Sequence, residues 1–180
     1  MINYQDIIDK YYNNNKKTKN ILLTHGKLVC DKALSISQNK PELNIDEDFI
    51  VEASMLHDIG IFLTKSPDLE CYGTYSYICH GYLGRELLDS ENLHKAALVA
   101  ERHTGTGISL FEILFKKLPL PKRDMLPVSI EEQLICFADK FYSKAHDLTI
   151  EIPIAKIRSK LIKHGEIQLK RFDKMCEFFL

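Results

Sequence analysis

The sequence predicts an all-α domain, a bundle of about six or more helices without a substantial sheet. Apolar residues recur at the 3.6-residue spacing of helices through most of the 180 residues. Capping residues such as Asp46 and Ser129 stand just before several of these segments. The alternation typical of a strand is confined to a weak stretch at 148–150. We therefore expect helices to form nearly the whole fold.

The elements follow in order from this pattern. Thr18 is expected to cap a long second helix, Pro41 to start a turn, and Gly60 to terminate the helix that Asp46 caps. Ser129, with Glu132 three residues later, is a capping-box signature. Residues 64–76 are expected to form a loop, and three prolines at 119, 121 and 127 a stiff connector. The expected helices cover residues 3–13, 18 to the mid-thirties, 47–57, 78–89, 92–103, 108–118, 130 to about 142 and, in one or two pieces interrupted near 165, 154 to the C-terminus.

Composition places the chain among ordinary globular proteins. Apolar residues make up 45% and charged residues 27%, and the net charge is −1. This charge argues against a broad nucleic-acid-binding surface. No apolar run approaches the roughly 18 residues of a membrane span, and the N-terminus lacks the pattern of a signal peptide, so a cytoplasmic location is expected. The five cysteines are scattered and are expected to be buried and reduced.

His57-Asp58-Ile59-Gly60 is the most informative stretch of the chain. His25, His80, His103 and Asp139 accompany it, each on the apolar face of a separate expected helix. Taken singly, each histidine is more often a hydrogen-bonded core residue than a ligand. Together, several polar groups in one small core all need partners, and a shared metal ion supplies them. Imidazole and carboxylate ligands suit zinc, manganese, iron, cobalt or nickel, with magnesium less suited. The sequence therefore predicts a buried metal site.

In the order of these residues the chain resembles the HD-domain metal-dependent phosphohydrolase superfamily, and most closely its small stand-alone HDIG-type members. The resemblance covers residues 18–145 and includes His80-Gly81-x-x-Gly84, Arg102-His103-Thr104-Gly105 and Phe137-Ala138-Asp139-Lys140. It implies a metal site of His25, His57, Asp58 and Asp139, with a second ion held by His80 and His103 and bridged by Asp58. Two departures are Ile61, where many HDIG proteins have lysine, and the long interval between His103 and Asp139. We expect an N-terminal helix at 1–17, the HD domain at 18–150 and a helical extension at 151–180 that packs on the same domain.

The resemblance implies an enzyme that hydrolyses phosphate esters or anhydrides of a nucleotide or another small phosphorylated molecule with a metal-bound hydroxide. His57 and Asp58 are the expected catalytic residues, and dinucleoside polyphosphates are the first substrates to test. Basic residues expected to contact the phosphate are Lys27, Lys65, Arg85, Arg102 and Lys140. The alternatives are a non-catalytic, ligand-binding or regulatory HD domain, and a phosphodiesterase acting on RNA or cyclic dinucleotides. Neither a membrane nor a nucleic-acid partner is expected, and the oligomeric state stays open.

Other histidines have simpler interpretations. His94 is expected on a solvated helix face, and His146-Asp147 near a helix end, where it can cap the helix or meet its dipole. The basic run from Lys156 to Lys163 is expected to be a solvated face, or else a rim that attracts phosphate.

Overall fold

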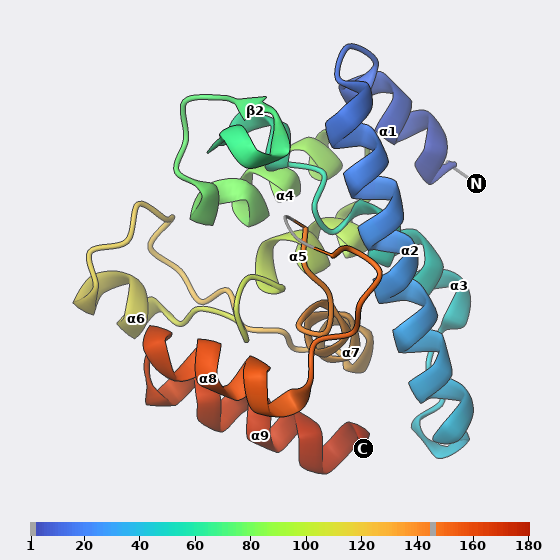
Figure 1. Ribbon diagram of the computed structural model, residues 1–180, viewed down its shortest axis with the longest axis vertical. Coiled ribbons are helices and arrows are strands. Elements are labelled where there is room, and N and C mark those ends of the chain that lie inside the picture. Colours follow the sequence, from blue (N-terminus) through green and yellow to red (C-terminus); the bar gives the residue numbers. More distant parts are fainter. Residues whose placement is uncertain (1–2, 145–146) are drawn as a thin grey trace.

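The computed structural model describes residues 3–144 and 147–180, and these residues form an almost entirely helical fold (Figure 1). The all-α prediction is confirmed. The helices are α1 (Tyr4–Tyr12), α2 (Lys16–Asn39), α3 (Glu47–Leu56), α4 (His80–Ser90), α5 (His94–Arg102), α6 (Leu110–Phe115), α7 (Ile130–Asp139), α8 (Ile154–His164) and α9 (Glu166–Phe179). Within the described ranges, the strands are β1 (Lys65–Ser66) and β2 (Cys71–Tyr72), which pair antiparallel.

The long helix α2 forms one side of the molecule, and α3 and α7 pack against it (Figure 1). α4 and α5 pack closely on each other, and α5 also contacts α3 and α7. Fully buried side chains from each of these helices meet in one core, including Val29, Ile50, Leu88, Ala97 and Phe137. Burial of these apolar side chains is the main force that holds the helices together. The core therefore lies where α2, α3, α5 and α7 converge.

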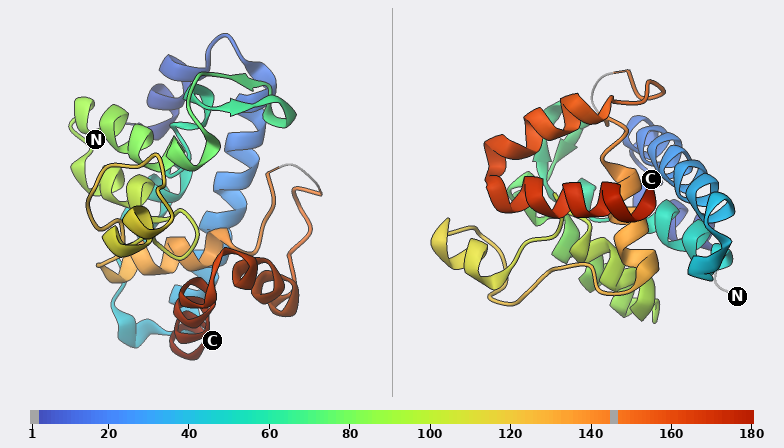
Figure 2. Two further views of the ribbon diagram at one scale, coloured as in Figure 1. Left: turned by 90° about the vertical axis from the view of Figure 1, so that its left-hand side faces the viewer. Right: turned by 90° about the horizontal axis from the view of Figure 1, so that it is seen from below.

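The C-terminal helices α8 and α9 lie side by side, and α9 also packs against α7 (Figure 2). Aromatic packing joins them to the core, because the ring of Phe137 lies 5.5 Å from that of Phe172 and 5.4 Å from that of Phe179, centroid to centroid. The predicted break between the two helices is confirmed at Gly165, which has a φ of +123°. The division of the chain at residues 18 and 150 stays a prediction.

Several local predictions are confirmed and others are wrong. Asp46 and Ser129 cap α3 and α7 as expected. Thr18 is not a cap, because α2 begins earlier, with Asn15 as the capping residue, and the Thr18 hydroxyl donates to the buried carbonyl oxygen of Leu69. The segment 64–76 contains the β1–β2 hairpin, whereas 148–150, the expected strand-like stretch, is a turn. In the described residues, no helix combines the length and apolar character needed to cross a membrane.

Candidate metal centre

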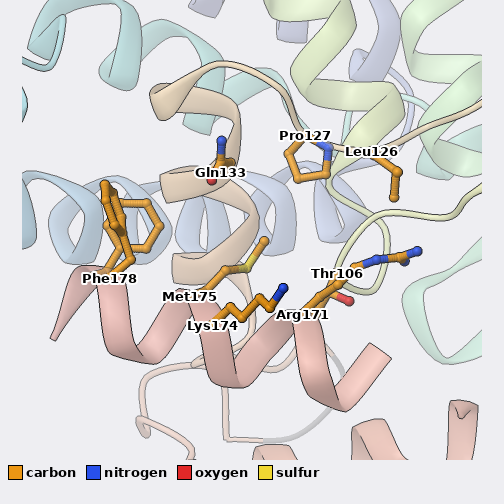
Figure 3. Close-up of a pocket in the computed structure, with 9 residues that line it drawn as sticks. Thr106, Leu126, Pro127, Gln133, Arg171, Lys174, Met175 and Phe178 are labelled. Carbon is orange, nitrogen blue, oxygen red and sulfur yellow. The ribbon is translucent and has the colours of Figure 1, made fainter. Parts of the chain in front are cut away.

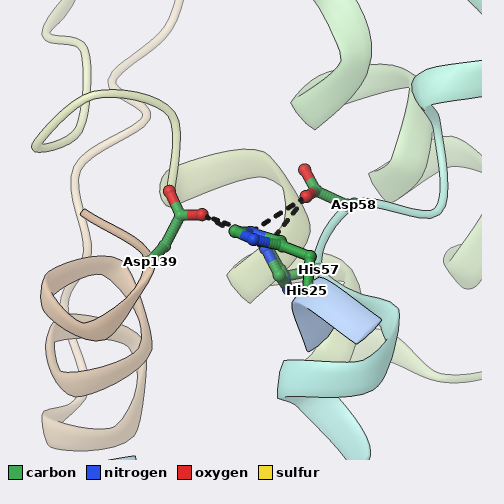
Figure 4. A group of neighbouring side chains, drawn as sticks. All are labelled: His25, His57, Asp58 and Asp139. Carbon is green, nitrogen blue, oxygen red and sulfur yellow. Dashed lines mark hydrogen bonds and ion pairs between the residues drawn. The ribbon is translucent and has the colours of Figure 1, made fainter. Parts of the chain in front are cut away.

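Four buried side chains from three parts of the chain meet in the core, and their ligand atoms all lie within 4.8 Å of one another. His25 comes from α2, His57 and Asp58 follow α3, and Asp139 is the last residue of α7. In Figure 4 the two imidazole rings lie between the two carboxylates. Nε2 of His25 is 2.8 Å from Oδ1 of Asp139, and Nε2 of His57 is 3.1 Å from Oδ2 of Asp58. We refer to these four residues as the first cluster.

The second cluster shares Asp58 with the first and adds His80 and His103. His80 is the first residue of α4, and His103 directly follows α5. Their Nε2 atoms lie 3.4 Å and 3.3 Å from Oδ1 of Asp58. The other oxygen of Asp58, Oδ2, faces the first cluster. The two oxygens of one carboxylate therefore face two different sets of histidines.

Three of the histidines are oriented by backbone carbonyl groups. Nδ1 of His57 lies 2.6 Å from the carbonyl oxygen of Ser54. His80 and His103 make the same contact with the carbonyl three residues earlier, at 2.7 Å and 2.8 Å. Because a carbonyl oxygen only accepts hydrogen bonds, each Nδ1 carries a proton and donates it. A neutral ring then has its free electron pair on Nε2, which faces the clusters and is the form that binds a metal.

Several ligand atoms lack a hydrogen-bond partner among the described residues. Both oxygens of Asp58 and Nε2 of His57 are buried and accept or donate no hydrogen bond among these residues. Their close contacts with charged neighbours do not have hydrogen-bond geometry. The Nε2 atoms of His80 and His103 lie 3.0 Å apart, although each neutral ring already uses its proton at Nδ1. Buried polar atoms normally have partners. A divalent transition-metal ion would accept electron pairs from all these atoms, so the residues fit such an ion.

The charge state of the clusters also suits a cation. Burial lowers the pKa of His25 to about 4 and that of His80 to about 3, so both rings are neutral at pH 7. Burial acts in the same direction on His57, but Asp58 and Asp139 outweigh it and raise the pKa of His57 to about 9. Burial raises the pKa of the two carboxyl groups, yet neighbouring positive groups hold it well below its usual range. A bound metal would therefore displace a proton from His57.

Two glycines allow the segments that carry the histidines to approach each other. A Cβ atom at Gly60 would lie 2.3 Å from the carbonyl oxygen of His80 and 2.5 Å from the backbone nitrogen of Gly84. A Cβ atom at Gly81 would lie 2.8 Å from the carbonyl oxygen of Ala100. The prediction that Gly60 terminates a helix is wrong, because α3 ends four residues earlier and Gly60 has an ordinary φ of −81°. Glycine is required at position 60 for space.

Of the five basic residues predicted to contact phosphate, Lys140 reaches the clusters. Its Nζ atom lies 2.7 Å from Oδ2 of Asp139 and donates to the carbonyl oxygen of His103. Arg85 and Arg102 instead form ion pairs with buried glutamates, Glu101 and Glu132 respectively. Lys27 is exposed and paired with Asp31, and Lys65 is exposed on β1.

The remaining histidines named from the sequence lie elsewhere. His94 is exposed and its Nδ1 atom lies 2.8 Å from a carboxylate oxygen of Asp89, as expected of a solvated helix face. His146 lies outside the described residues, and Asp147 beside it has a positive φ of 42°.

Lys144 is the charged residue that the sequence patterns did not indicate. Its Nζ atom lies 2.9 Å from Oδ2 of Asp58 and 3.3 Å from Oδ1 of Asp139, and the side chain is largely buried. Burial lowers the pKa of Lys144, but the two carboxylates prevail and raise it well above its usual value. Lys144 follows Lys140 by one helical turn but lies beyond the end of α7, so helical periodicity could not place it. The feature of the sequence that could have indicated Lys144 is its position five residues after Asp139, a ligand-type aspartate.

Two cavities adjoin the clusters, and Tyr77 lines both of them. The lysine cavity, of about 290 Å³, is lined by Ser66, Asp68, Leu69, Tyr77, Ser143 and Lys144. The apolar cavity, of about 400 Å³, is lined by Tyr77, Ile78, Thr104, Gly105, Ile108, Glu112, Lys116, Leu118, Leu161, His164 and Gln168. A third cavity, of about 390 Å³, lies between α7, residues 126–127 and α9 (Figure 3). Its described lining shares no residue with the lining of either of the other two cavities.

Comparison with protein families decides the classification. A family model described as HD domain matches residues 22–143. This chain belongs to the HD-domain family. The match contains all six residues of the two clusters, and HD domains bind divalent metals, in agreement with the buried His and Asp donors. The narrower resemblance to the HDIG type stays a prediction.

Three relatives of this HD-domain chain are 25–30% identical to it over the aligned residues. An uncharacterized protein of Methanocaldococcus jannaschii is 30% identical over 146 residues, which cover 76% of this chain and 79% of that protein. A tRNA (cytidine(56)-2'-O)-methyltransferase of Picrophilus torridus is 26% identical over 86% of this chain, and one of Thermoplasma volcanium is 25% identical over 85%. This chain spans 41% of the length of each of these two methyltransferases. No solved structure matches the chain significantly.

Proposed function

We propose that this HD-domain chain is a metal-dependent phosphohydrolase that acts on a nucleotide or another small phosphorylated molecule. The observation that carries the proposal is the position of Asp58, whose two oxygens face separate sets of histidine Nε2 atoms. A carboxylate in this position can bridge two ions, and two-metal sites are one established way in which enzymes hydrolyse phosphate esters. Six buried donors for two ions also leave ligand positions open for substrate, which a closed structural site does not.

Each residue of the centre has a role in this proposal. His25, His57 and Asp139 would hold one ion and His80 and His103 the other, with Asp58 between them. Such ions supply Lewis acidity, which activates water and neutralises charge on phosphoryl oxygens at neutral pH. Lys140 holds Asp139 in place. Lys144, which lines the lysine cavity, offers a positive charge to an incoming phosphoryl group.

The rival interpretation is a regulatory HD domain that binds a ligand without hydrolysing it. Such a domain has no need to keep two complete sets of donors. Here all six donor residues are buried and grouped at ligand spacing, with their rings oriented by backbone carbonyl groups. This arrangement favours the enzyme.

A second candidate substrate is RNA, and the relatives favour it. Two proteins that match most of this chain are named tRNA (cytidine(56)-2'-O)-methyltransferase. A phosphodiesterase that acts on a tRNA-derived phosphate would use the same metal chemistry. The net charge of −1 favours the small substrate, because RNA binding depends on many contacts from Lys and Arg to phosphates.

The test is a substrate panel with the purified protein and added manganese or ferrous iron. The panel contains mononucleotides, dinucleoside polyphosphates, cyclic dinucleotides and structured RNA. We expect turnover of a small phosphorylated compound, and its loss in Asp58→Asn but not in the surface variant His94→Ala. Turnover confined to RNA would select the second candidate. Retained metal without turnover of any compound would select the regulatory domain.

A further inference from the structure

The wall of the apolar cavity comes partly from the family-matched region and partly from helices beyond it. Its apolar wall includes Ile78, Ile108 and Leu118 from the family-matched region. Leu161 and Gln168 complete the wall from α8 and α9, which lie outside the matched residues 22–143. The volume of about 400 Å³ falls within the roughly 300–1,000 Å³ of small-molecule sites. The C-terminal helices thus close a ligand-sized space over the HD domain.

This cavity lies directly beside the second cluster. The ring of Tyr77 is 4.7 Å from the ring of His80, centroid to centroid, and its carbonyl oxygen accepts the Nδ1 proton of the same histidine. On the other side, Thr104 and Gly105 follow His103 in the chain and line the same cavity. Tyr77 also lines the lysine cavity, so the apolar cavity and the cavity that contains Lys144 have this one lining residue in common.

Charge determines which part of such a molecule each cavity accepts. Glu112 lines the apolar cavity and is only 3% exposed. Hydrogen bonds from Ser109, Gln168 and Arg171 keep it ionised despite its burial. A buried carboxylate disfavours a phosphate group beside it, so we place the phosphate near Lys144 and the uncharged organic part near Glu112. Lys116 and His164 also line this cavity, and the Nζ atom of Lys116 donates to the carbonyl oxygen of His164.

The carboxylate also has room for one more donor. Among the described residues, Oε1 of Glu112 accepts a hydrogen bond from Gln168 alone, at 2.9 Å. Oε2 accepts from both the backbone and the hydroxyl group of Ser109 and pairs with Arg171. A carboxylate oxygen accepts two hydrogen bonds readily. A ligand with an N–H donor at the edge of an apolar ring therefore complements this wall.

We propose that the apolar cavity binds the base of a nucleoside, a flat ring with an exocyclic amino group directed at Glu112, with the sugar beside Tyr77. This assignment rests on the proposed function only for the place of the phosphate. The base is held between aliphatic side chains, and Glu112 distinguishes amino-bearing rings from those without the group.

The test uses adenosine, which has no phosphate, so that binding is measured apart from hydrolysis. Titration of metal-free protein with adenosine is followed by calorimetry and by NMR of the isoleucine and leucine methyl groups. We expect binding with perturbation of the Ile78, Ile108 and Leu161 methyl signals. Purine riboside, which lacks the amino group, should bind at least about 10-fold more weakly, a difference of about 1.4 kcal/mol.

Two cavity-filling variants and one matched control locate the site. Leu161→Trp and Leu118→Trp fill the cavity from two different segments, α8 and the segment after α6, so either can serve if the other does not fold. Each should weaken adenosine binding at least about 10-fold. Ile162→Trp places the same ring on the exposed side of α8 and should leave binding unchanged.

The outcomes separate this proposal from the proposed function. If phosphorylated compounds are hydrolysed but adenosine does not bind, the base-binding site is refuted and the hydrolase stands. The same conclusion follows if adenosine binds to folded Leu161→Trp or Leu118→Trp with the affinity of the wild type. Equal affinity for purine riboside refutes the role of Glu112. If adenosine binds at the cavity but no phosphorylated compound is hydrolysed, the site stands and the proposed function fails.

Discussion

Glu112 is expected to be a large single source of pH-dependent stability in this fold. It connects α6 to α9, because its carboxylate accepts from Gln168 and pairs with Arg171 at 2.8 Å. It also caps α6 through reciprocal hydrogen bonds with Ser109. The perturbation is Glu112→Gln, which keeps the size of the side chain but removes its charge and one carboxylate oxygen.

The magnitude follows from the pKa of the group. Burial raises the pKa of Glu112, but hydrogen bonds from Gln168, Ser109 and Arg171 prevail and lower it from 4.5 to about 2. Because the folded-state pKa is lowered, the ionised group stabilises the fold at pH values above 4.5, and this stability is lost as the pH falls towards 2. At about 1.4 kcal/mol per tenfold change in proton affinity, the full contribution is about 3 kcal/mol. About 1.4 kcal/mol of it should remain at pH 3.

The assay is urea unfolding of both proteins between pH 7 and pH 3, with a chelator present so that metal binding does not contribute. We expect Glu112→Gln to be less stable by up to about 3 kcal/mol at pH 7, and the difference to shrink towards pH 3. Glu86→Gln removes a charge from an exposed position and should change the free energy of unfolding by less than about 0.5 kcal/mol. A difference between wild type and Glu112→Gln that stays constant over this pH range would refute the reasoning.

Three further predictions concern the metal centre. Metal analysis should find up to two ions per chain, and the number should fall towards one in the double variant His80→Ala, His103→Ala. If the wild type binds one ion per chain and the double variant binds the same number, the second site does not exist. Asp58→Ala should abolish metal retention because the two oxygens of Asp58 face both clusters. The control variant His94→Ala should keep the metal content of the wild type. Full metal content in Asp58→Ala would contradict the bridging role. Gly60→Ala should lower the free energy of unfolding by at least about 2 kcal/mol, because the new Cβ atom would lie 2.3 Å from the carbonyl oxygen of His80. An unchanged urea midpoint would show that the backbone can move aside.

The ligand-type residues could be found from the sequence because each lies on a helix with a clear apolar period or directly after the end of one. His25, His57 and Asp139 are surrounded in sequence by residues that must be buried, so their own burial follows from helical spacing. The helices themselves followed from the same signal and from caps such as Asp46 and Ser129. The reason is that these features are local, since a helix repeats every 3.6 residues and a cap acts within one turn.

The tertiary structure decided everything that depends on distance across the chain. Lys144 reaches Asp58 from 86 positions later in the sequence, and Arg85, close to His80 in sequence, is instead paired with Glu101. Gly60 matters because the backbone of α4 passes beside it, which its own neighbours in sequence do not reveal. The apolar cavity likewise exists only because α8 and α9 pack back over the HD domain. Sequence by itself determined which side chains are buried, but long-range packing determined which of them meet, because contact between distant segments depends on how whole helices pack rather than on local periodicity.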